Sequence, residues 1–220
     1  MKLLQTLALT VPPLLLAVIL HEIAHGYMAE RLGDPTARRL GRIKLNPLVH
    51  IDPFMTVILP GLLILSGSPI VFGGAKPVPV DPRYFSNPRR GMAYVALAGP
   101  ITNFVLASCF YGVMLLFLHF QSALSLLPTW LAITLVYWTL HSIIINLVLG
   151  LFNLLPVPPL DGGRIAVGFL PLKLARHVAQ LERYGLLIVI ALLYFGVVDR
   201  YLGPAINFVT QHIEQVLNAS

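Results

Sequence analysis

Charged side chains are scarce in this sequence. Asp, Glu, Lys and Arg make up 11% of its 220 residues, against about 25% in soluble domains. Apolar residues make up 57%, and the mean hydropathy is +0.81. This composition excludes an ordinary soluble domain and predicts an integral membrane protein.

Cysteine is almost absent as well. Cys109 is the single thiol, which excludes an internal disulfide. The sequence also contains no internal repeat, low-complexity tract or appended soluble domain, so we expect residues 1–220 to form one membrane-embedded domain. The net charge of +6 comes from basic residues in the gaps between apolar runs rather than on a soluble face. We therefore expect the lipid bilayer as a partner, and no nucleic acid.

Four apolar runs are candidate membrane spans, at about 3–30, 92–118, 130–152 and 184–198. A helix needs roughly 20 residues to cross a bilayer. The run Tyr184–Val198 has 15, so it needs a tilt or help from neighbouring residues. The first run is longer than a signal-peptide core of about 7–15 residues and no A-x-A-like site follows it, so we interpret it as a retained helix.

A fifth run, residues 54–72, is interrupted by Pro60-Gly61 and by a second Gly- and Pro-containing break. Such breaks are tolerated in a membrane where protein or water satisfies the backbone, which favours a re-entrant hairpin over a simple span. Thirteen of the 15 Lys and Arg lie in residues 31–90 and 161–183. If 54–72 is re-entrant, all thirteen face the cytoplasm and the N-terminus lies outside. If it spans, the five basic residues of 31–44 lie outside.

Three shorter segments have recognisable patterns. Residues 38–50 alternate weakly and predict a short strand. Residues 73–80, GGAKPVPV, are expected to be extended because each proline disfavours helix at the residue before it. Residues 204–217 place apolar side chains on one face and predict an amphipathic helix at the membrane interface. The expected fold is an all-α polytopic membrane protein with a small membrane-embedded β-like or re-entrant element.

The strongest chemical signal is His21-Glu22-Ile23-Ala24-His25, an H-E-x-x-H pattern inside the first apolar helix. Residues i and i+4 lie on the same helix face. Two such histidines can bind one Zn²⁺, and the glutamate between them can act as a general base on a water whose pKa the metal lowers to about 7. Ionisable groups inside a membrane helix are costly without a function, which favours a metal site.

Catalytic zinc usually has a third protein ligand. The candidate that stands apart is Asp161, in FNLLPVPPLDGGR at the end of an apolar run, although a helix-capping aspartate is an alternative. The metal lies about 15 Å below the cytoplasmic end of the first helix, whereas the helix that ends near Phe152 has almost crossed the bilayer. We therefore expect residues 153–161 to turn back into the membrane in a water-filled cavity.

Taken together, H-E-x-x-H and N-x-x-P-x-P-x-x-D-G (Asn153 to Gly162) resemble the site-2 protease family of intramembrane zinc metalloproteases. GRIKLNPLVHIDP, GGAKPVPV, NPRRGM and ALAGPITN resemble short prokaryotic members without PDZ or CBS domains. The resemblance implies one zinc ion held by His21, His25 and Asp161, with Glu22 as the base. It also implies that Asn153 holds the substrate or stabilises the oxyanion.

The family resemblance further implies cleavage of transmembrane protein substrates in a prokaryotic cell membrane, at a site toward the cytoplasm. Residues 38–50 and 73–80 resemble the region that pairs with unwound substrate, a role that β-augmentation explains. Two alternatives remain open from the sequence. One is a catalytically silent scaffold with a structural zinc, and the other is a metal transporter. The natural substrate and the oligomeric state do not follow from the sequence.

Overall fold

The computed structural model describes residues 2–58, 61–62, 65 and 73–219. Within these residues the chain is all helical, apart from turns and extended segments, and contains no strand. The longer helices are α1 (Lys2–Arg31), α4 (Pro88–His119), α6 (Thr129–Asn153) and α10 (Val197–Ala219). The shorter α-helices are α2 (Thr36–Arg39), α5 (Gln121–Leu124), α7 (Asp161–Phe169), α8 (Leu172–Gln180) and α9 (Gly185–Tyr194). Four short helices of other types are η1 (Pro47–His50), η2 (Pro53–Ile58), η3 (Pro82–Tyr84) and η4 (Leu181–Tyr184).

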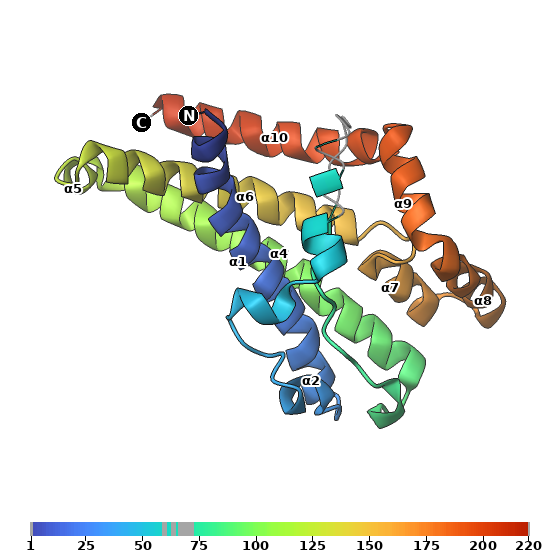
Figure 1. Cartoon of the computed structure of the whole chain (residues 1–220). Helices are drawn as coiled ribbons and strands as arrows, with labels where there is room; N and C mark the ends of the chain where they lie inside the picture. Colours follow the sequence, from blue (N-terminus) through green and yellow to red (C-terminus); the bar gives the residue numbers. More distant parts are fainter. Residues whose placement is uncertain (1, 59–60, 63–64, 66–72, 220) are drawn as a thin grey trace.

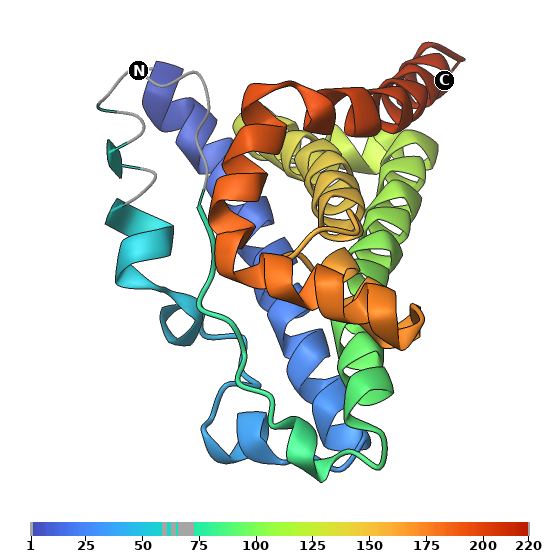
Figure 2. The same cartoon turned by 90° about the vertical axis from the view of Figure 1, so that its right-hand side faces the viewer.

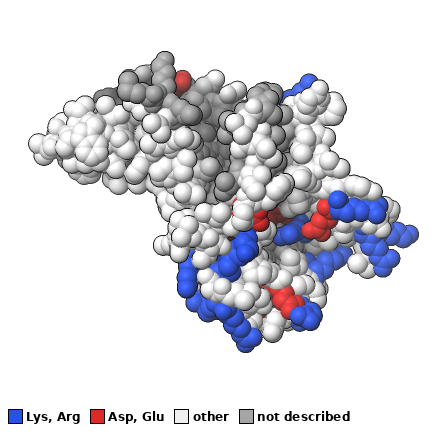
Figure 3. All heavy atoms as spheres, in the orientation of Figure 1, with Lys and Arg blue, Asp and Glu red and all other residues white. Residues whose placement is uncertain are grey.

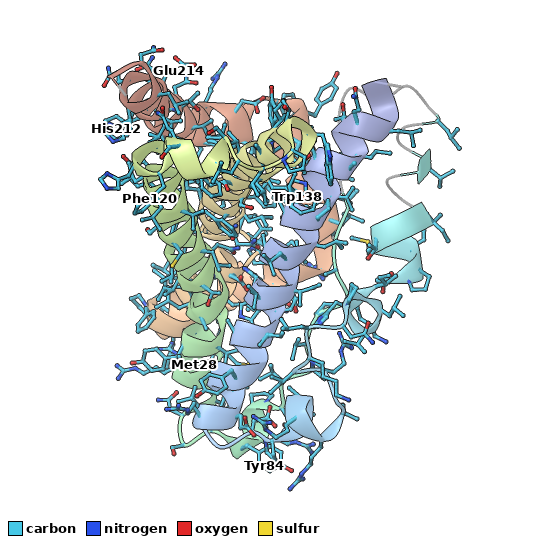
Figure 4. All side chains as sticks on the ribbon, turned by 90° about the vertical axis from the view of Figure 1, so that its left-hand side faces the viewer. Met28, Tyr84, Phe120, Trp138, His212 and Glu214 are labelled. Atoms are coloured by element: carbon cyan, nitrogen blue, oxygen red, sulfur yellow. The ribbon has the colours of Figure 1, made fainter. Side chains whose placement is uncertain are left out.

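Helices α4 and α6 lie side by side and antiparallel, joined through α5, and α1 crosses both of them (Figure 1). Figure 2 shows α7, α8 and α9 gathered beside the end of α6, with α10 across the top of the molecule. One tryptophan of α6 joins this helix to α1, because Trp138 Nε1 donates to the carbonyl of Ala8 at 3.0 Å (Figure 4).

Four stretches are long and apolar enough to cross a membrane: Leu4–Arg31, Pro88–His119, Thr129–Asn153 and Leu172–Tyr194. The prediction of an all-α polytopic membrane protein is confirmed. The fourth stretch differs from the expected 184–198, because it begins at α8 and ends with α9. Gly196, with φ +64°, follows α9, and its N–H bonds to the carbonyl of Leu193. A left-handed glycine at this position ends a helix.

The strand expected over 38–50 is wrong. The Asp34 carboxylate accepts the N–H of Thr36 at 2.9 Å at the start of α2, and Gly41, with φ +65°, follows the end of α2. The Asn46 side chain then accepts the N–H of Leu48 and begins η1. Local capping and turn chemistry therefore overrides a weak apolar alternation.

Residues 73–80 have no regular secondary structure and run alongside the lower half of α1 (Figure 2). This agrees with the extended chain expected from their prolines. The region of the expected re-entrant hairpin begins with η2, but most of residues 59–72 lie outside the described part of the chain.

Helix α10 covers the range in which an amphipathic helix was expected. Its apolar face packs against protein, since Ile213 forms a buried cluster with Met114 of α4 and Ile143 of α6. On the same helix, His212 Nε2 lies 2.8 Å from the hydroxyl of Tyr111. The location of α10 at the membrane interface stays a prediction.

Candidate metal centre

The two histidines of the H-E-x-x-H pattern and Asp161 meet at one point. His21 and His25 lie one turn apart on α1, and Asp161 is the first residue of α7. Asp161 Oδ2 lies 3.1 Å from His21 Nε2 and 3.3 Å from His25 Nε2. The two Nε2 atoms lie 3.0 Å apart. All three side chains are buried, so these atoms form a compact triangle shielded from bulk solvent.

The hydrogen bonds behind the imidazoles determine which ring nitrogens carry protons. His25 Nδ1 lies 2.7 Å from the Val95 carbonyl, which can only accept, so this nitrogen donates. Asn146 Nδ2 donates to the Ser142 carbonyl, which leaves Asn146 Oδ1 to accept from Asn103 Nδ2 at 2.9 Å. Asn103 Oδ1 then faces His21 Nδ1 at 2.6 Å and accepts its proton. In neutral imidazoles, both Nε2 atoms are therefore lone-pair acceptors.

The triangle consequently joins two imidazole lone pairs and a carboxylate oxygen with no proton among them. Asp161 Oδ2 is buried and receives no hydrogen bond despite its short distances to both rings. Three converging acceptors repel one another unless a cation lies between them.

The triangle has dimensions that suit zinc. Tetrahedral Zn²⁺ bonds of about 2.0–2.2 Å place neighbouring ligand atoms about 3.3–3.6 Å apart. The observed edges of 3.0–3.3 Å are close to this range. His21, Glu22 and His25 also offer ligand atoms within 4.8 Å of one another. Asp161 Oδ2 lies within 3.3 Å of both Nε2 atoms, which favours Asp161 as the third ligand.

A reversal of the chain after α6 brings Asp161 to the histidines. The amide of Val157 bonds to the carbonyl of Leu155, and that of Leu160 bonds to the carbonyl of Val157. At the start of α7, a side chain on Gly162 would collide with the carbonyl oxygens of Leu154 and Leu155. The chain therefore doubles back beside the end of α6. The position of this turn within a bilayer stays a prediction.

Glu22 points toward the extended segment. Its Oε2 accepts the backbone N–H of Val78 at 2.9 Å. A cavity of about 310 Å³ adjoins the triangle and is lined by Glu22 and Asn153 as well as by the three triangle residues. Asn153 is the last residue of α6, and its Nδ2 donates to the Leu149 carbonyl at 3.0 Å. The second N–H of this amide has no hydrogen-bond partner among the described residues.

Sequence reasoning missed two residues that shape the triangle. Asn103 bonds to Asn146 and also orients His21. A Cβ atom on Gly99 would lie 2.5–2.6 Å from the rings of His21 and His25. The segment AGPITN of α4 therefore supplies the glycine that lets α4 approach the two imidazoles and the buried amide oxygen that accepts from His21 Nδ1. The available signal was an asparagine in an apolar run, one helical turn after a glycine.

Comparisons with known proteins identify a family for the chain. The model of the family described as "Peptidase family M50" matches residues 10–196. "Putative zinc metalloprotease YwhC" of Bacillus subtilis is 38% identical over 194 residues, which covers 88% of this chain and 84% of the relative. "Putative zinc metalloprotease Rip2" of Mycolicibacterium smegmatis is 30% identical over 189 residues, which covers 85% of this chain and 67% of the relative. No solved structure matches the chain.

Proposed function

The chain belongs to peptidase family M50, the site-2 protease family, and we propose that it is an intramembrane zinc metalloendopeptidase. In this proposal, His21, His25 and Asp161 bind one zinc ion, and Glu22 is the general base. The observation that carries the proposal is the buried triangle of two imidazole lone pairs and a carboxylate oxygen, which needs a cation at its centre. The names of the relatives specify zinc.

When bound by His21, His25 and Asp161, zinc would supply Lewis-acid chemistry, lowering the pKa of a water and polarising the substrate carbonyl. The Glu22 carboxylate accepts a proton from the attacking water and then passes it to the nitrogen of the leaving amine. The C–N bond breaks, and the products are a carboxylate and an amine. Asn153, with one N–H free beside the cavity, stabilises the negative charge that develops on the carbonyl oxygen.

The substrates are transmembrane proteins, and the bilayer is the environment of the reaction. A helical peptide bond is protected by its own hydrogen bonds, so the substrate must be extended before the attack. Residues of the extended segment 73–80, including Gly74 and Val78, line the cavity. An extended substrate can contact this segment as an added strand. Pro77 and Pro79 have no N–H to donate, so this contact depends mainly on carbonyl acceptors.

The active site opens toward the cytoplasm in this proposal, with the N-terminus outside. Lys and Arg gather over the lower and right parts of the face in Figure 3, where the segments 31–58, 73–90 and 161–183 lie, and are sparse over the upper left part. Clustering of basic residues at one end fits the positive-inside rule, and a prokaryotic cell membrane is the expected location.

The test of this function uses full-length protein in liposomes with a panel of single-span substrates. We expect cleavage within or near the substrate helix, its loss when zinc is chelated, and its recovery when Zn²⁺ is restored. Absence of cleavage across the panel by protein that contains zinc would support a silent scaffold. Zinc flux into the liposomes without cleavage would support a transporter.

We expect Asn103→Leu to lower the zinc affinity about 10- to 100-fold, the usual effect of removing a group that orients a metal-binding histidine. The substitution preserves the approximate side-chain volume but removes the acceptor for His21 Nδ1. Isothermal titration of the metal-free protein with Zn²⁺ measures the effect. Asn207→Leu, at an exposed position on α10, is the matched control. An unchanged affinity for Asn103→Leu would contradict the role of Asn103.

A further inference from the structure

The extended segment 73–80 holds the proposed base by a single backbone group. The Val78 N–H donates to Glu22 Oε2 at 2.9 Å. Within the described residues, Glu22 Oε1 has no hydrogen-bond partner. The Val78 amide therefore restrains one carboxylate oxygen and leaves the other available for proton transfer.

Neither residue next to Val78 can replace this donor. Pro77 and Pro79 have no N–H. The N–H of Lys76 bonds to the carbonyl of His50 at 2.8 Å. The orientation of Glu22 consequently depends on where the segment holds Val78.

Arg42 holds the segment in place immediately before Val78. Its Nη2 donates to the carbonyl of Lys76 at 2.8 Å and to that of Pro77 at 3.3 Å. The Arg42 residue is only 9% exposed, and its Nε has no hydrogen-bond partner among the described residues. Burying a guanidinium is costly, and here its hydrogen bonds go to two consecutive backbone carbonyls next to the Glu22 contact.

A second anchor follows Val78. The fully buried carboxylate of Asp34 accepts the amide of Asp81 at 2.7 Å through Oδ2. The segment is thus anchored at residues 76–77 and again at 81, and Val78 lies between these points. A side chain on Gly26 of α1 would lie 3.1 Å from the Val78 side chain, so the segment also packs tightly against the helix that carries Glu22.

We propose that Arg42 is a positioning residue for the general base. It acts through the carbonyls of Lys76 and Pro77 and the amide of Val78, a set that we term the Glu22 clamp. The inference rests on the proposed function for its effect on catalysis, but the clamp is a physical contact that can be measured without substrate. Loss of the clamp frees the Glu22 carboxylate to rotate away from the reacting water while the metal ligands stay in place.

Hydrogen exchange tests the contact directly on the full chain in detergent, with overlapping peptides that cover 73–81. The prolines leave Val78 as the only amide between Lys76 and Val80, so its exchange can be assigned. We expect at least about 10-fold faster exchange of this amide in Glu22→Ala and in Arg42→Gln. Glu22→Gln keeps an acceptor oxygen and should preserve slow exchange. Equal exchange in wild type, Glu22→Ala and Arg42→Gln would overturn the clamp.

Cleavage kinetics test the effect of the Glu22 clamp on catalysis. We expect Arg42→Gln to lower kcat about 10- to 100-fold, with KM changed less than about 3-fold and one zinc per chain retained. Arg42→Lys, which can still donate to both carbonyls, should recover part of kcat. Arg38→Gln, an exposed arginine of α2, is the control. A parallel fall in zinc content and kcat would assign Arg42 a general structural role and overturn the positioning role.

A second pair of variants keeps the inference testable if Arg42→Gln does not fold. Val78→Pro removes the donor in a segment that already holds prolines on both sides, whereas Val78→Ala keeps it. We expect kcat at least about 10-fold lower for Val78→Pro than for Val78→Ala, and equal kcat values would overturn the clamp. If wild type cleaves nothing, the proposed function fails, and hydrogen exchange still decides the clamp.

Discussion

Glu22→Gln is expected to lower kcat by about 10²- to 10⁴-fold, the usual contribution of a general acid–base group. The glutamine has nearly the same shape and its carbonyl oxygen can still accept the N–H of Val78. The neutral amide cannot accept the proton of the attacking water. Since 1.36 kcal/mol corresponds to each factor of ten, the transition state loses about 2.7–5.4 kcal/mol.

This loss should occur without loss of metal, because the triangle contains no atom of Glu22. The measurement pairs single-turnover cleavage of a single-span substrate in liposomes with zinc content by elemental analysis. Glu214→Gln is the matched control, since Glu214 is exposed on α10 and lies far from the lower half of α1 (Figure 4). Cleavage at the wild-type rate by Glu22→Gln would refute its assignment as the base.

Asp161→Ala is expected to weaken zinc binding at least about 100-fold. This exceeds the 10- to 100-fold loss that is typical when a group that only orients a metal ligand is removed. The substitution removes the only anionic atom of the triangle and leaves two imidazole lone pairs 3.0 Å apart. Zinc would then be held by two protein ligands, one fewer than catalytic sites use. Activity should be lost together with the metal.

Competition with a chelating dye measures this affinity in detergent. Asp199→Ala, at an exposed position on α10, is the matched control, since no residue of α10 lines the cavity. Glu22→Gln provides a second comparison, because it should keep zinc and lose activity, whereas Asp161→Ala should lose both. Wild-type zinc affinity in Asp161→Ala would mean that Glu22, which also lies near both imidazoles, is the third ligand.

Much of the membrane architecture could be predicted from the sequence, because it depends on composition and run length. Long uncharged runs locate α1, α4 and α6 directly. The fourth stretch that is long and apolar enough to cross covers α8, η4 and α9, whereas the sequence predicts 184–198, and the bounds of this span stay a prediction. The short strand predicted at 38–50 is wrong because local hydrogen bonds set the backbone there. The Asp34 side chain accepts the N–H of Thr36, and the Asn46 side chain caps η1.

The part of the candidate site that lies on α1 was also predictable from the sequence. His21 and His25 share a helix face through the i, i+4 spacing, and Glu22 accompanies them in the motif. Asp161 was proposed on the strength of the family resemblance, since residue types alone left several acids possible. Gly99 and Asn103 were not assigned to the site, because their role depends on how α4 packs against α1.

By itself, the sequence determined that this is a helical membrane protein with a metal-binding pattern in its first helix, because hydropathy and helical spacing act over short distances along the chain. Tertiary structure alone decided which carboxylate meets the histidines and which amide holds Glu22. Asp161 lies 136 positions after His25 (161 − 25), yet Oδ2 comes within 3.3 Å of its ring. That contact depends on the chain reversal after α6 and the packing of α7 and α4 around α1, which no local pattern encodes.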